Sequence, residues 1–431
     1  MGDGLDAEVV TRWATAFGTY LAAGPVVVGR DSRPSGSMVL PAVAASLMST
    51  GHDVWDIGVA TTPTTAMAVS ESEAVGGVII TASHNPQPWN ALKFLDAGGL
   101  FLTAEANQHL QEKLDSGEGH VTAAELGSWQ SRQDADRNHL DAILKLPWLD
   151  RQQIAARNLH VVVDAVEGAG GRIVPALLSA LGVRCTPLYC GMSGHFPHDP
   201  EPTPAHLTQL CHTVREQGAD LGCAVDPDSD RLALVDGTGQ PLSEELTLVL
   251  AVDFLLGHQA GPVVVNLSTT SLVEKVAAGH GVPVERTPVG EANVVQTMRA
   301  KGAVIGGEGN GGVIYPALHA GRDALVGIAM ILQSLTEKDS TLAQLVSALP
   351  PAAMVKEKVA SDTVPLGDNL AAIMRGWESG TIDTRDGVRW SSADGWVHVR
   401  PSNTEPVVRI IAEARSDAAA RSLIERVKSA S

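Results

Sequence analysis

The segment Thr81–Pro86 places a serine hydroxyl in a polar turn directly after an apolar run. The run Ala74–Ile80 is short and rich in β-branched residues, which is typical of a buried strand. Ser83 therefore follows the carboxyl end of a predicted strand, where open α/β sheets bind their ligands. The neighbouring His84 could orient or polarise a bound group. Because polar residues are also ordinary turn formers, the segment alone predicts a nucleophile but leaves a simple turn open.

A second polar segment, Asp226–Arg231, follows the apolar run Leu221–Val225. Its three carboxylates stand at alternate positions, and such crowding of like charge is unfavourable unless a cation neutralises it. Dense oxygen ligands beside a phosphate suit Mg²⁺. A calcium loop of the EF-hand type needs Gly at its sixth position and Glu at its twelfth, where this chain has Arg231 and Gly237. The segment predicts a magnesium site, with an acidic turn as the alternative.

Two further segments carry groups suited to a sugar phosphate. Gly306–Gly312 follows the apolar run Ala303–Ile305, and its glycines allow close approach of a ligand, although a structural turn is an equal alternative. Glu308 and Asn310 there offer an acceptor and an amide for sugar hydroxyls. Arg400–Pro406 places a guanidinium, two hydroxyls and an amide close together, which favours a phosphate monoester over a capped turn. No Walker or Rossmann glycine loop competes for that role.

Together the four segments resemble those of the α-D-phosphohexomutase family, which includes phosphoglucosamine mutase, phosphomannomutase and phosphoglucomutase. The similarity extends along nearly the whole chain, with the motifs in the family's order. It implies an isomerase that interconverts hexose 6-phosphate and hexose 1-phosphate through a phosphoserine enzyme and a bisphosphorylated sugar, with Mg²⁺ as cofactor. Phosphoglucosamine mutase-like activity with relaxed specificity is the preferred interpretation, and phosphomannomutase or phosphoglucomutase activity is the alternative.

The resemblance also implies roles for individual residues. Ser83 would carry the phosphoryl group and share Mg²⁺ with Asp226, Asp228 and Asp230. Lys93 or His84 would act as acid or base, since a serine alcohol needs a base to take its proton, and Arg231 would contact the active-site phosphate. The remaining binding residues fall into a sugar-selecting pair and a phosphate-binding set: Glu308 and Asn310, then Arg400, Ser402, Asn403 and Thr404.

The chain departs from the family pattern at its start and at three later positions. Family members usually open with a strand that reads Phe-Gly-Thr-x-Gly-x-Arg-Gly, whereas this sequence starts at Met1–Leu5. We therefore expect a first domain without that edge strand and without its arginine. Many members have Ser and His where this chain has Asn310 and Gly312, and Lys where it has Pro288. Because Gly312 has no side chain, we expect weaker discrimination between hexoses.

Length and composition limit the number of domains, the possible partners and the cellular compartment. The 431 residues suffice for three or four domains that each bury a core. A formal net charge of −18 argues against nucleic acid or an anionic membrane as partner, but it is compatible with an anionic substrate bound by a few focused cations. With no signal peptide, no long apolar span and no Cys-x-x-Cys, we expect a cytoplasmic protein with reduced thiols.

The order of predicted elements indicates an internal repeat. Strand-like runs at Pro25–Gly29, Leu159–Val163 and Pro262–Asn266 each open a unit of about a hundred residues that contains one of the first three segments. We predict three similar mixed-sheet α/β domains, at residues 1–147, 156–257 and 258–351. The resemblance implies that they surround a central cleft together with a smaller α+β domain at residues 352–431.

The predicted C-terminal domain alternates differently from the others. Strands are expected at Met354–Val359, Trp396–Val399 and Val407–Ala412, and a helix at Asn369–Trp377. A terminal amphipathic helix should follow, with one apolar face formed by Ala420, Leu423, Ile424 and Val427.

Two other functions could use the same candidate site residues. A phosphatase would pass the phosphoryl group to water instead of back to a sugar. A non-catalytic sugar-phosphate binding protein would fit if the N-terminal strand is truly absent, although such a binder has no use for a serine nucleophile.

Overall fold

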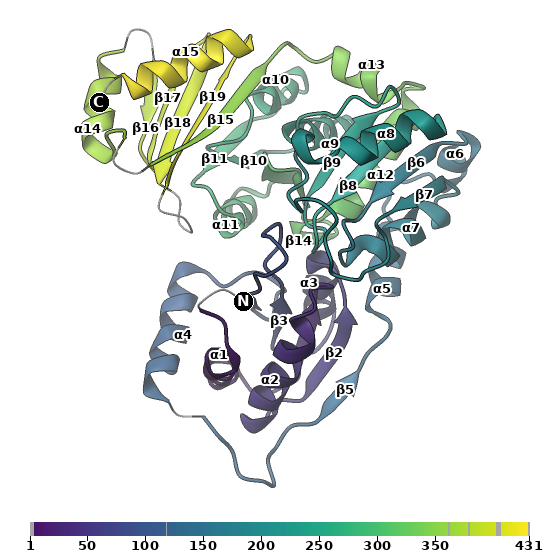
Figure 1. The fold of residues 1–431 in the computed structure, drawn as a ribbon, viewed down its shortest axis with the longest axis vertical. Helices are drawn as coiled ribbons and strands as arrows, with labels where there is room; N and C mark the ends of the chain where they lie inside the picture. The colour runs from purple at the N-terminus through teal and green to yellow at the C-terminus, as the bar shows by residue number, and fades with distance from the viewer. Residues whose placement is uncertain (1–3, 118, 361–362, 378–379, 402–406, 430–431) are drawn as a thin grey trace.

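The computed structural model describes residues 4–117, 119–360, 363–377, 380–401 and 407–429. Within these ranges the strands form separate sheets with helices packed against them, in the order of four successive domains (Figure 1). None of the helices in the described ranges has the length and apolar character needed to cross a bilayer.

Domain I contains a mixed sheet of order β4-β3-β1-β2-β5. Its strands are β1 Val26–Arg30, β2 Val54–Val59, β3 Gly76–Ile80, β4 Leu92–Leu95 and β5 Trp129–Ser131. Its helices are α1 Ala7–Tyr20, α2 Gly36–Ser49, α3 Thr62–Ser70, α4 Ala104–Ser116 and α5 Ala135–Ile143. Within the described residues, β4 and β5 form the two edges of this sheet.

Domains II and III follow with sheets of order β7-β6-β8-β9 and β11-β10-β12-β13-β14. Domain II consists of α6 Arg151–Ala156, β6 His160–Asp164, α7 Gly170–Ala180, β7 Arg184–Leu188, the short 3₁₀ turn η1 Pro204–His206, α8 Thr208–Gln217, β8 Leu221–Val225 and β9 Leu232–Asp236. Domain III consists of α9 Glu245–His258, β10 Val263–Asn266, α10 Leu272–Gly279, β11 Val284–Thr287, α11 Glu291–Lys301, β12 Ile305–Glu308, β13 Gly312–Tyr315, β14 His319–Arg322, α12 Ala324–Glu337 and α13 Leu342–Ser347.

The three domains repeat one strand pattern, as the sequence predicted. In each, a central strand (β1, β6 or β10) pairs in parallel with two neighbours. One of those neighbours (β3, β8 or β12) then pairs antiparallel with the strand that follows it. The Ser83 segment, the triple-aspartate segment and the glycine-rich segment are the three connections at this antiparallel step. Because the topology is the same, each of the three segments follows the carboxyl end of the equivalent strand in its domain.

Domain IV is an antiparallel sheet of order β15-β19-β18-β17-β16. Its elements are β15 Ala353–Ala360, α14 Gly367–Arg375, β16 Thr381–Asp383, β17 Val388–Ser391, β18 Gly395–Pro401, β19 Val407–Ala414 and α15 Asp417–Lys428. Ala420, Ile424 and Val427 of α15 are fully buried, and Leu423 is partly buried against the same core. The apolar face predicted for the terminal helix is therefore confirmed.

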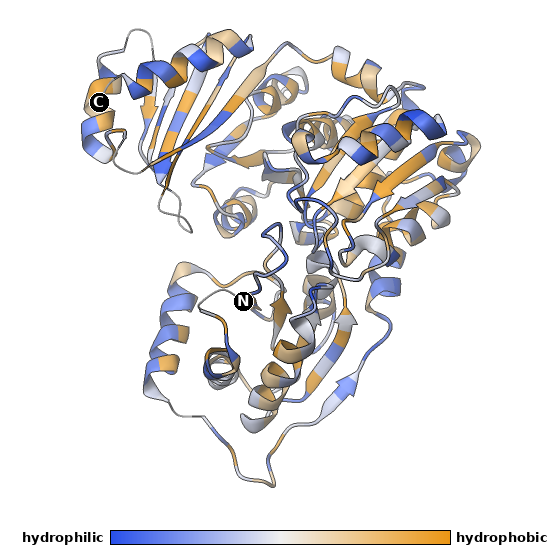
Figure 2. Cartoon of the chain, viewed as in Figure 1, coloured by the Kyte–Doolittle hydropathy of each residue, from blue (hydrophilic) through white to orange (hydrophobic). Residues whose placement is uncertain are grey.

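Domains II and III share a large hydrophobic core and each has a smaller cluster besides, whereas domains I and IV have cores of their own. Valines of β6 and β10 belong to the shared core together with residues from α9 and α12, most of whose residues are buried. In Figure 2 hydrophobic residues concentrate along the strands, and α8 shows a hydrophilic face. The shared core fixes the triple-aspartate segment of domain II relative to the glycine-rich segment of domain III.

The sequence prediction was wrong in one detail of the glycine-rich segment. Gly306, Gly307 and Glu308 belong to strand β12, so the connection to β13 spans only residues 309–311. Strand β12 continues past the apolar run because the partner strands β10 and β13 supply its backbone hydrogen bonds whether or not the residue is glycine. Arg400 and Pro401 likewise end strand β18 and do not belong to a loop.

Domain IV is attached to domain III through a buried histidine of β18. His398 Nε2 donates to the carbonyl of Asp386 at 2.6 Å, so its Nδ1 accepts from the Ser268 hydroxyl at 2.9 Å. Asp386 in turn accepts from the backbone N–H of Val289 at 2.9 Å. Burial lowers the pKa of His398 to about 4.

This lowered pKa predicts acid sensitivity of the folded state. Between pH 6.5 and 4 the unfolded chain binds a proton at His398 that the folded chain does not bind, so stability falls as pH falls through that window. Replacing the ring by His398→Asn should make the melting temperature less dependent on pH there than in the wild type. Scanning calorimetry at several pH values measures this, with exposed His109→Asn as control. Equal slopes for His398→Asn and wild type would contradict the assignment.

Candidate active site

Ser83 lies in the connection from β3 to β4 with a backbone φ of 50°, and its side chain is largely buried. A positive φ is uncommon for a residue other than glycine and is held here by surrounding contacts. The Thr81 hydroxyl accepts from the Ser83 backbone N–H at 2.9 Å. The Ser83 hydroxyl donates to Asp226 Oδ2 at 2.9 Å, which joins domain I to domain II at the predicted nucleophile.

A fully buried arginine, Arg33, holds the Ser83 segment in this shape. Its guanidinium donates to four backbone carbonyls of the segment: Ser83 at 2.6 Å, Asn85 at 2.7 Å, Pro86 at 2.7 Å and Trp89 at 3.0 Å. Its Nε pairs with Asp31 Oδ2 at 2.9 Å, and the same carboxylate oxygen accepts from the Thr81 hydroxyl at 2.7 Å. Asp31 and Arg33 therefore determine the backbone path on which Ser83 lies.

The carboxylates of Asp226, Asp228 and Asp230 gather beside Ser83. All three residues are fully buried, and one oxygen from each lies within 4.8 Å of the others. Asp226 Oδ1 accepts from the backbone N–H groups of Asp230 and Arg231, both at 3.1 Å. Asp228 Oδ2 accepts from the Thr62 hydroxyl of α3 at 2.7 Å. The predicted metal ligands are thus brought together by their own loop and by domain I.

Several buried polar atoms around Ser83 have no hydrogen-bond partner among the described residues. They are Asp228 Oδ1, Asp230 Oδ1, Arg231 Nε and His84 Nδ1. Buried polar atoms without a partner are costly, so such a cluster of acceptors and donors points to ligands that complete it. Two unpartnered carboxylate oxygens and an oxygen-only donor set suit a hard divalent cation. The residues present therefore fit a metal.

Three cations from three domains face this negative charge. Lys93 Nζ of β4 lies 2.8 Å from Asp228 Oδ2. Arg231 Nε lies 3.7 Å from Asp230 Oδ1 and 3.9 Å from Asp226 Oδ2. Arg322 Nη2 at the end of β14 lies 2.6 Å from Asp230 Oδ2.

Burial and the neighbouring charges raise the pKa of some groups in this cluster and lower the pKa of others. Burial, together with the neighbouring Asp228 and Asp230, holds the pKa of Asp226 well above its usual range. Although burial would raise the pKa of Asp228, Lys93 keeps it below its usual range. Burial opposes the charged form of Lys93, yet Asp228 and Asp230 raise the pKa of this amine. Lys93 therefore holds its proton when only these groups surround it.

His84 has a different electrostatic setting from Lys93. Burial and then the nearby Arg231 lower its pKa to about 3, so the ring is neutral at physiological pH. Neither His84 nor Lys93 hydrogen-bonds the Ser83 hydroxyl in the described structure, whose acceptor is Asp226. The structure therefore places Asp226 closer to the serine proton than either base that the sequence suggested.

The sugar-selecting pair predicted from sequence lies on domain III beside this cluster. Glu308 is buried and accepts from Asn266 Nδ2 at 2.9 Å, from the Gly290 N–H at 3.1 Å and from Arg322 Nη1 at 2.9 Å. Asn310 is partly exposed, and its Oδ1 accepts from the backbone N–H of Gly312 at 3.2 Å. Arg322 thereby contacts both Asp230 of the triple-aspartate segment and Glu308 of the glycine-rich segment.

The phosphate-binding residues predicted from sequence are described only in part. Arg400 is buried at the end of β18, and its Nε donates to both oxygens of Asp386, each at 3.1 Å. This ion pair orients the guanidinium and couples it to the contact between domains III and IV. Ser402, Asn403 and Thr404 lie outside the described residues.

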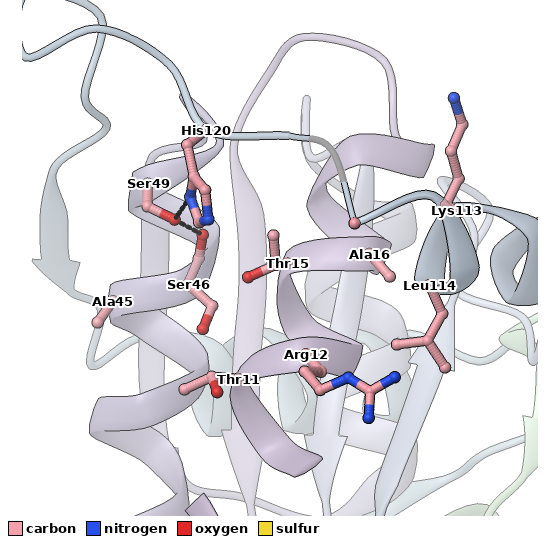
Figure 3. A pocket seen from close by; sticks show the side chains of 11 residues that line it. Thr11, Arg12, Thr15, Ala16, Ala45, Ser46, Ser49, Lys113, Leu114 and His120 are labelled. Atoms are coloured by element: carbon pink, nitrogen blue, oxygen red, sulfur yellow. Dashed lines mark hydrogen bonds between the residues drawn. The ribbon is translucent and has the colours of Figure 1, made fainter. Parts of the chain in front are cut away.

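A cavity of about 400 Å³ lies elsewhere, on the outer side of domain I between α1, α2 and α4 (Figure 3). The hydroxyls of Thr11, Ser46 and Ser49 in its wall donate to helix carbonyls. None of the candidate catalytic residues lines it. The cavity is therefore separate from the Ser83 cluster.

Sequence reasoning missed several residues of the site: Asp31, Arg33, Thr62, Arg322 and Glu291, whose carboxylate pairs with Arg322 Nε at 2.8 Å. A signal existed for the first two, because they follow the apolar run of β1 just as Ser83 follows β3. The others come from the start of α3, the start of α11 and the end of β14, which only the packing of domains brings near the aspartates.

Four family models match successive parts of the chain. They describe phosphoglucomutase/phosphomannomutase α/β/α domain I at residues 1–120, domain II at 137–239, domain III at 243–353 and the C-terminal domain at 351–430.

Individual proteins show the same likeness. A phosphoglucomutase/phosphomannomutase of Thermococcus kodakarensis is 35% identical over 97% of this chain and 93% of its own length. A probable phosphoglucosamine mutase of Methanopyrus kandleri is 35% identical over 98% and 93%. The crystal structure of a phosphoglucomutase/phosphomannomutase family protein from Burkholderia thailandensis superimposes with a TM-score of 0.86 at 27% identity, over 100% of this chain and 94% of that chain.

The Arg33 contacts predict a large effect of removing its charge. Arg33→Met leaves Asp31 buried without its partner and frees four carbonyls, and breaking a buried pair in this way typically costs about 3–5 kcal/mol. The free energy of unfolding of domain I, followed by urea titration, measures the loss, and faster amide exchange across residues 83–90 would locate it. Exposed Arg12→Met is the control. Similar stability and exchange in the two variants would show that the Arg33 contacts are dispensable.

Proposed function

The chain belongs to the phosphoglucomutase/phosphomannomutase family, and we propose that it interconverts hexose 6-phosphates and hexose 1-phosphates through phosphorylated Ser83. One observation carries the proposal. The Ser83 hydroxyl is hydrogen-bonded to Asp226 within a cluster of buried acceptors and donors that lack partners. A phosphoryl group on Ser83 and a cation beside it would supply those partners.

The reaction proceeds by two phosphoryl transfers. In the first, the bond between the Ser83 oxygen and phosphorus breaks, and a free hydroxyl of the bound hexose monophosphate forms the new bond. The resulting bisphosphate turns over in the site, so that its other phosphate faces Ser83. The second transfer returns a phosphoryl group to Ser83 and releases the isomeric monophosphate. Such transfers depend on positioning and charge neutralisation more than on covalent chemistry by the protein.

The chain's own cations and carboxylates are placed for these steps. Arg231 Nε, which is buried and has no hydrogen-bond partner among the described residues, is available to donate to a phosphoryl oxygen on Ser83. Asp226, Asp228 and Asp230 would hold Mg²⁺ together with an oxygen carried by Ser83. When bound, Mg²⁺ supplies neutralisation of the charge on the transferring group.

Each phosphoryl transfer also moves two protons. In the first transfer Asp226, whose pKa is raised, gives a proton to the Ser83 oxygen as it leaves phosphorus, and neutral His84, whose buried Nδ1 has no hydrogen-bond partner among the described residues, takes the proton of the attacking sugar hydroxyl. In the second transfer both protons move back: Asp226 takes the proton of the Ser83 hydroxyl, and His84 protonates the sugar oxygen that leaves. Lys93, which holds its proton beside Asp228, would add positive charge next to the reacting oxygens.

The substrate is proposed to be a hexosamine phosphate, with glucose and mannose phosphates as weaker substrates. The relatives named phosphoglucosamine mutase and phosphoglucomutase/phosphomannomutase support both parts of this proposal. Glu308 and Asn310 would hold the sugar ring, and the segment from Arg400 to Thr404 would hold the phosphate that does not react. We place the enzyme in the cytoplasm, where its sugar phosphate substrates occur.

A phosphatase or a binding protein would use the same residues differently. A phosphatase needs water at the transferring phosphoryl group, and a binder needs no nucleophile. The burial of Ser83 among carboxylates and cations favours transfer to a bound sugar.

Replacing the nucleophile tests the proposal. Ser83→Ala should reduce mutase turnover by several orders of magnitude, because the covalent route is lost altogether. The rate is measured with glucosamine, glucose and mannose 1-phosphates in the presence of a catalytic amount of the bisphosphate, and free phosphate is monitored in parallel. Near-normal turnover in Ser83→Ala would refute the nucleophile. Stoichiometric phosphate release by the wild type would identify a phosphatase, and no reaction on any sugar would favour a binding protein.

A further inference from the structure

The missing side chain of Gly312 makes room for Arg322. A Cβ built at Gly312 would lie 2.3 Å from Arg322 Cδ and 2.9 Å from its Cγ, far closer than carbon atoms pack. Gly312 is the last residue of the glycine-rich segment Gly306–Gly312 and the first residue of strand β13. The aliphatic stem of Arg322 therefore runs through the volume that a side chain of this segment would otherwise fill.

From there the guanidinium reaches three carboxylates on three elements. Nη2 contacts Asp230 of the metal segment at 2.6 Å, Nη1 contacts Glu308 of the sugar segment at 2.9 Å, and Nε contacts Glu291 of α11 at 2.8 Å. Arg322 and its partners are almost completely buried. Charge-assisted contacts of this kind are strong and directional, so one planar group fixes the relative placement of all three.

We infer that Arg322 is a positioning residue that balances cation binding against sugar binding, because Asp230 and Glu308 share its guanidinium. The inference rests on the proposed function, and it assigns to a residue of β14 part of the sugar selectivity that Gly312 cannot supply.

The two ligands should respond to loss of Arg322 in opposite directions. For a divalent cation, Arg322 is a competing positive charge on Asp230, so its removal should tighten cation binding. For the sugar, Arg322 holds one oxygen of Glu308, while Asn266 and the Gly290 N–H hold the other. Its removal should leave Glu308 loosely oriented and weaken sugar binding. A variant that merely damaged the fold would weaken both.

The experiment compares Arg322→Gln with the wild type as the full chain. Titration calorimetry with Mg²⁺ alone, on dephosphorylated protein, gives the cation affinity without turnover. Steady-state kinetics gives KM and kcat for glucosamine 1-phosphate at saturating Mg²⁺. We expect the Mg²⁺ dissociation constant to fall roughly tenfold and KM to rise roughly tenfold or more, in keeping with loss of a buried charged contact.

Two further variants guard against misfolding and general damage. Gly312→Ala keeps every charge, suffers no backbone strain in an extended strand, and displaces the Arg322 stem, so it should reproduce the same pair of opposite changes more weakly. Arg12→Gln removes an exposed cation of α1 that lies outside the site. It should leave both quantities within roughly threefold of the wild type, because an isolated exposed charge contributes little.

The outcomes separate the inference from the proposed function. An unchanged Mg²⁺ affinity in Arg322→Gln, or a fall in both affinities in Arg322→Gln and Gly312→Ala, would overturn the inference. A wild type that turns over no hexose phosphate would instead overturn the proposed function, while the Mg²⁺ arm would still report whether Arg322 opposes the cation.

Discussion

The buried negative charge of Asp226, Asp228 and Asp230 is the constraint on which the rest of the site depends. Three carboxylates removed from water in one loop repel one another strongly, and no neutral packing could offset that cost. The chain offsets it with Lys93 from domain I, Arg231 from the same loop and Arg322 from domain III. The site therefore forms only where three domains meet, and several of its buried polar atoms have no hydrogen-bond partner among the described residues.

The repeated topology of the three α/β domains places their connecting segments at equivalent positions. Each of the three α/β domains turns from a buried strand into an antiparallel neighbour at the same point of its sheet, and each places a different chemistry at that turn. The first presents Ser83, the proposed nucleophile, the second the carboxylates and the third the residues proposed to hold the sugar. Domains II and III are fixed to each other by a common core, whereas domain I meets them through polar contacts such as Thr62 to Asp228 and Ser83 to Asp226.

Much of this arrangement could be predicted from sequence, because strand-like apolar runs alternate with polar segments along the chain. The strands around Pro25, Leu159 and Pro262 differ from prediction by about one residue, and the three carboxylates do converge. The residues that were missed make contacts with segments that are distant in the sequence. Arg33 binds backbone carbonyls, which leave no trace in residue type, and Arg322 reaches the aspartates only through the volume left by Gly312. Local pattern carries no information about either contact. The strand that continues through Gly306 and Gly307 was missed because glycine indicates turns unless its pairing partners are known.

The central claim is that the phosphoryl group resides on Ser83 during turnover. Incubation of the wild-type enzyme with a hexose 1,6-bisphosphate, followed by rapid acid quenching and peptide mass mapping, tests it directly. The account predicts one phosphoryl group per chain, located on the peptide that contains Ser83. Transfer to another residue, such as the neighbouring Thr81, or an enzyme that turns over without any covalent phosphate, would contradict it.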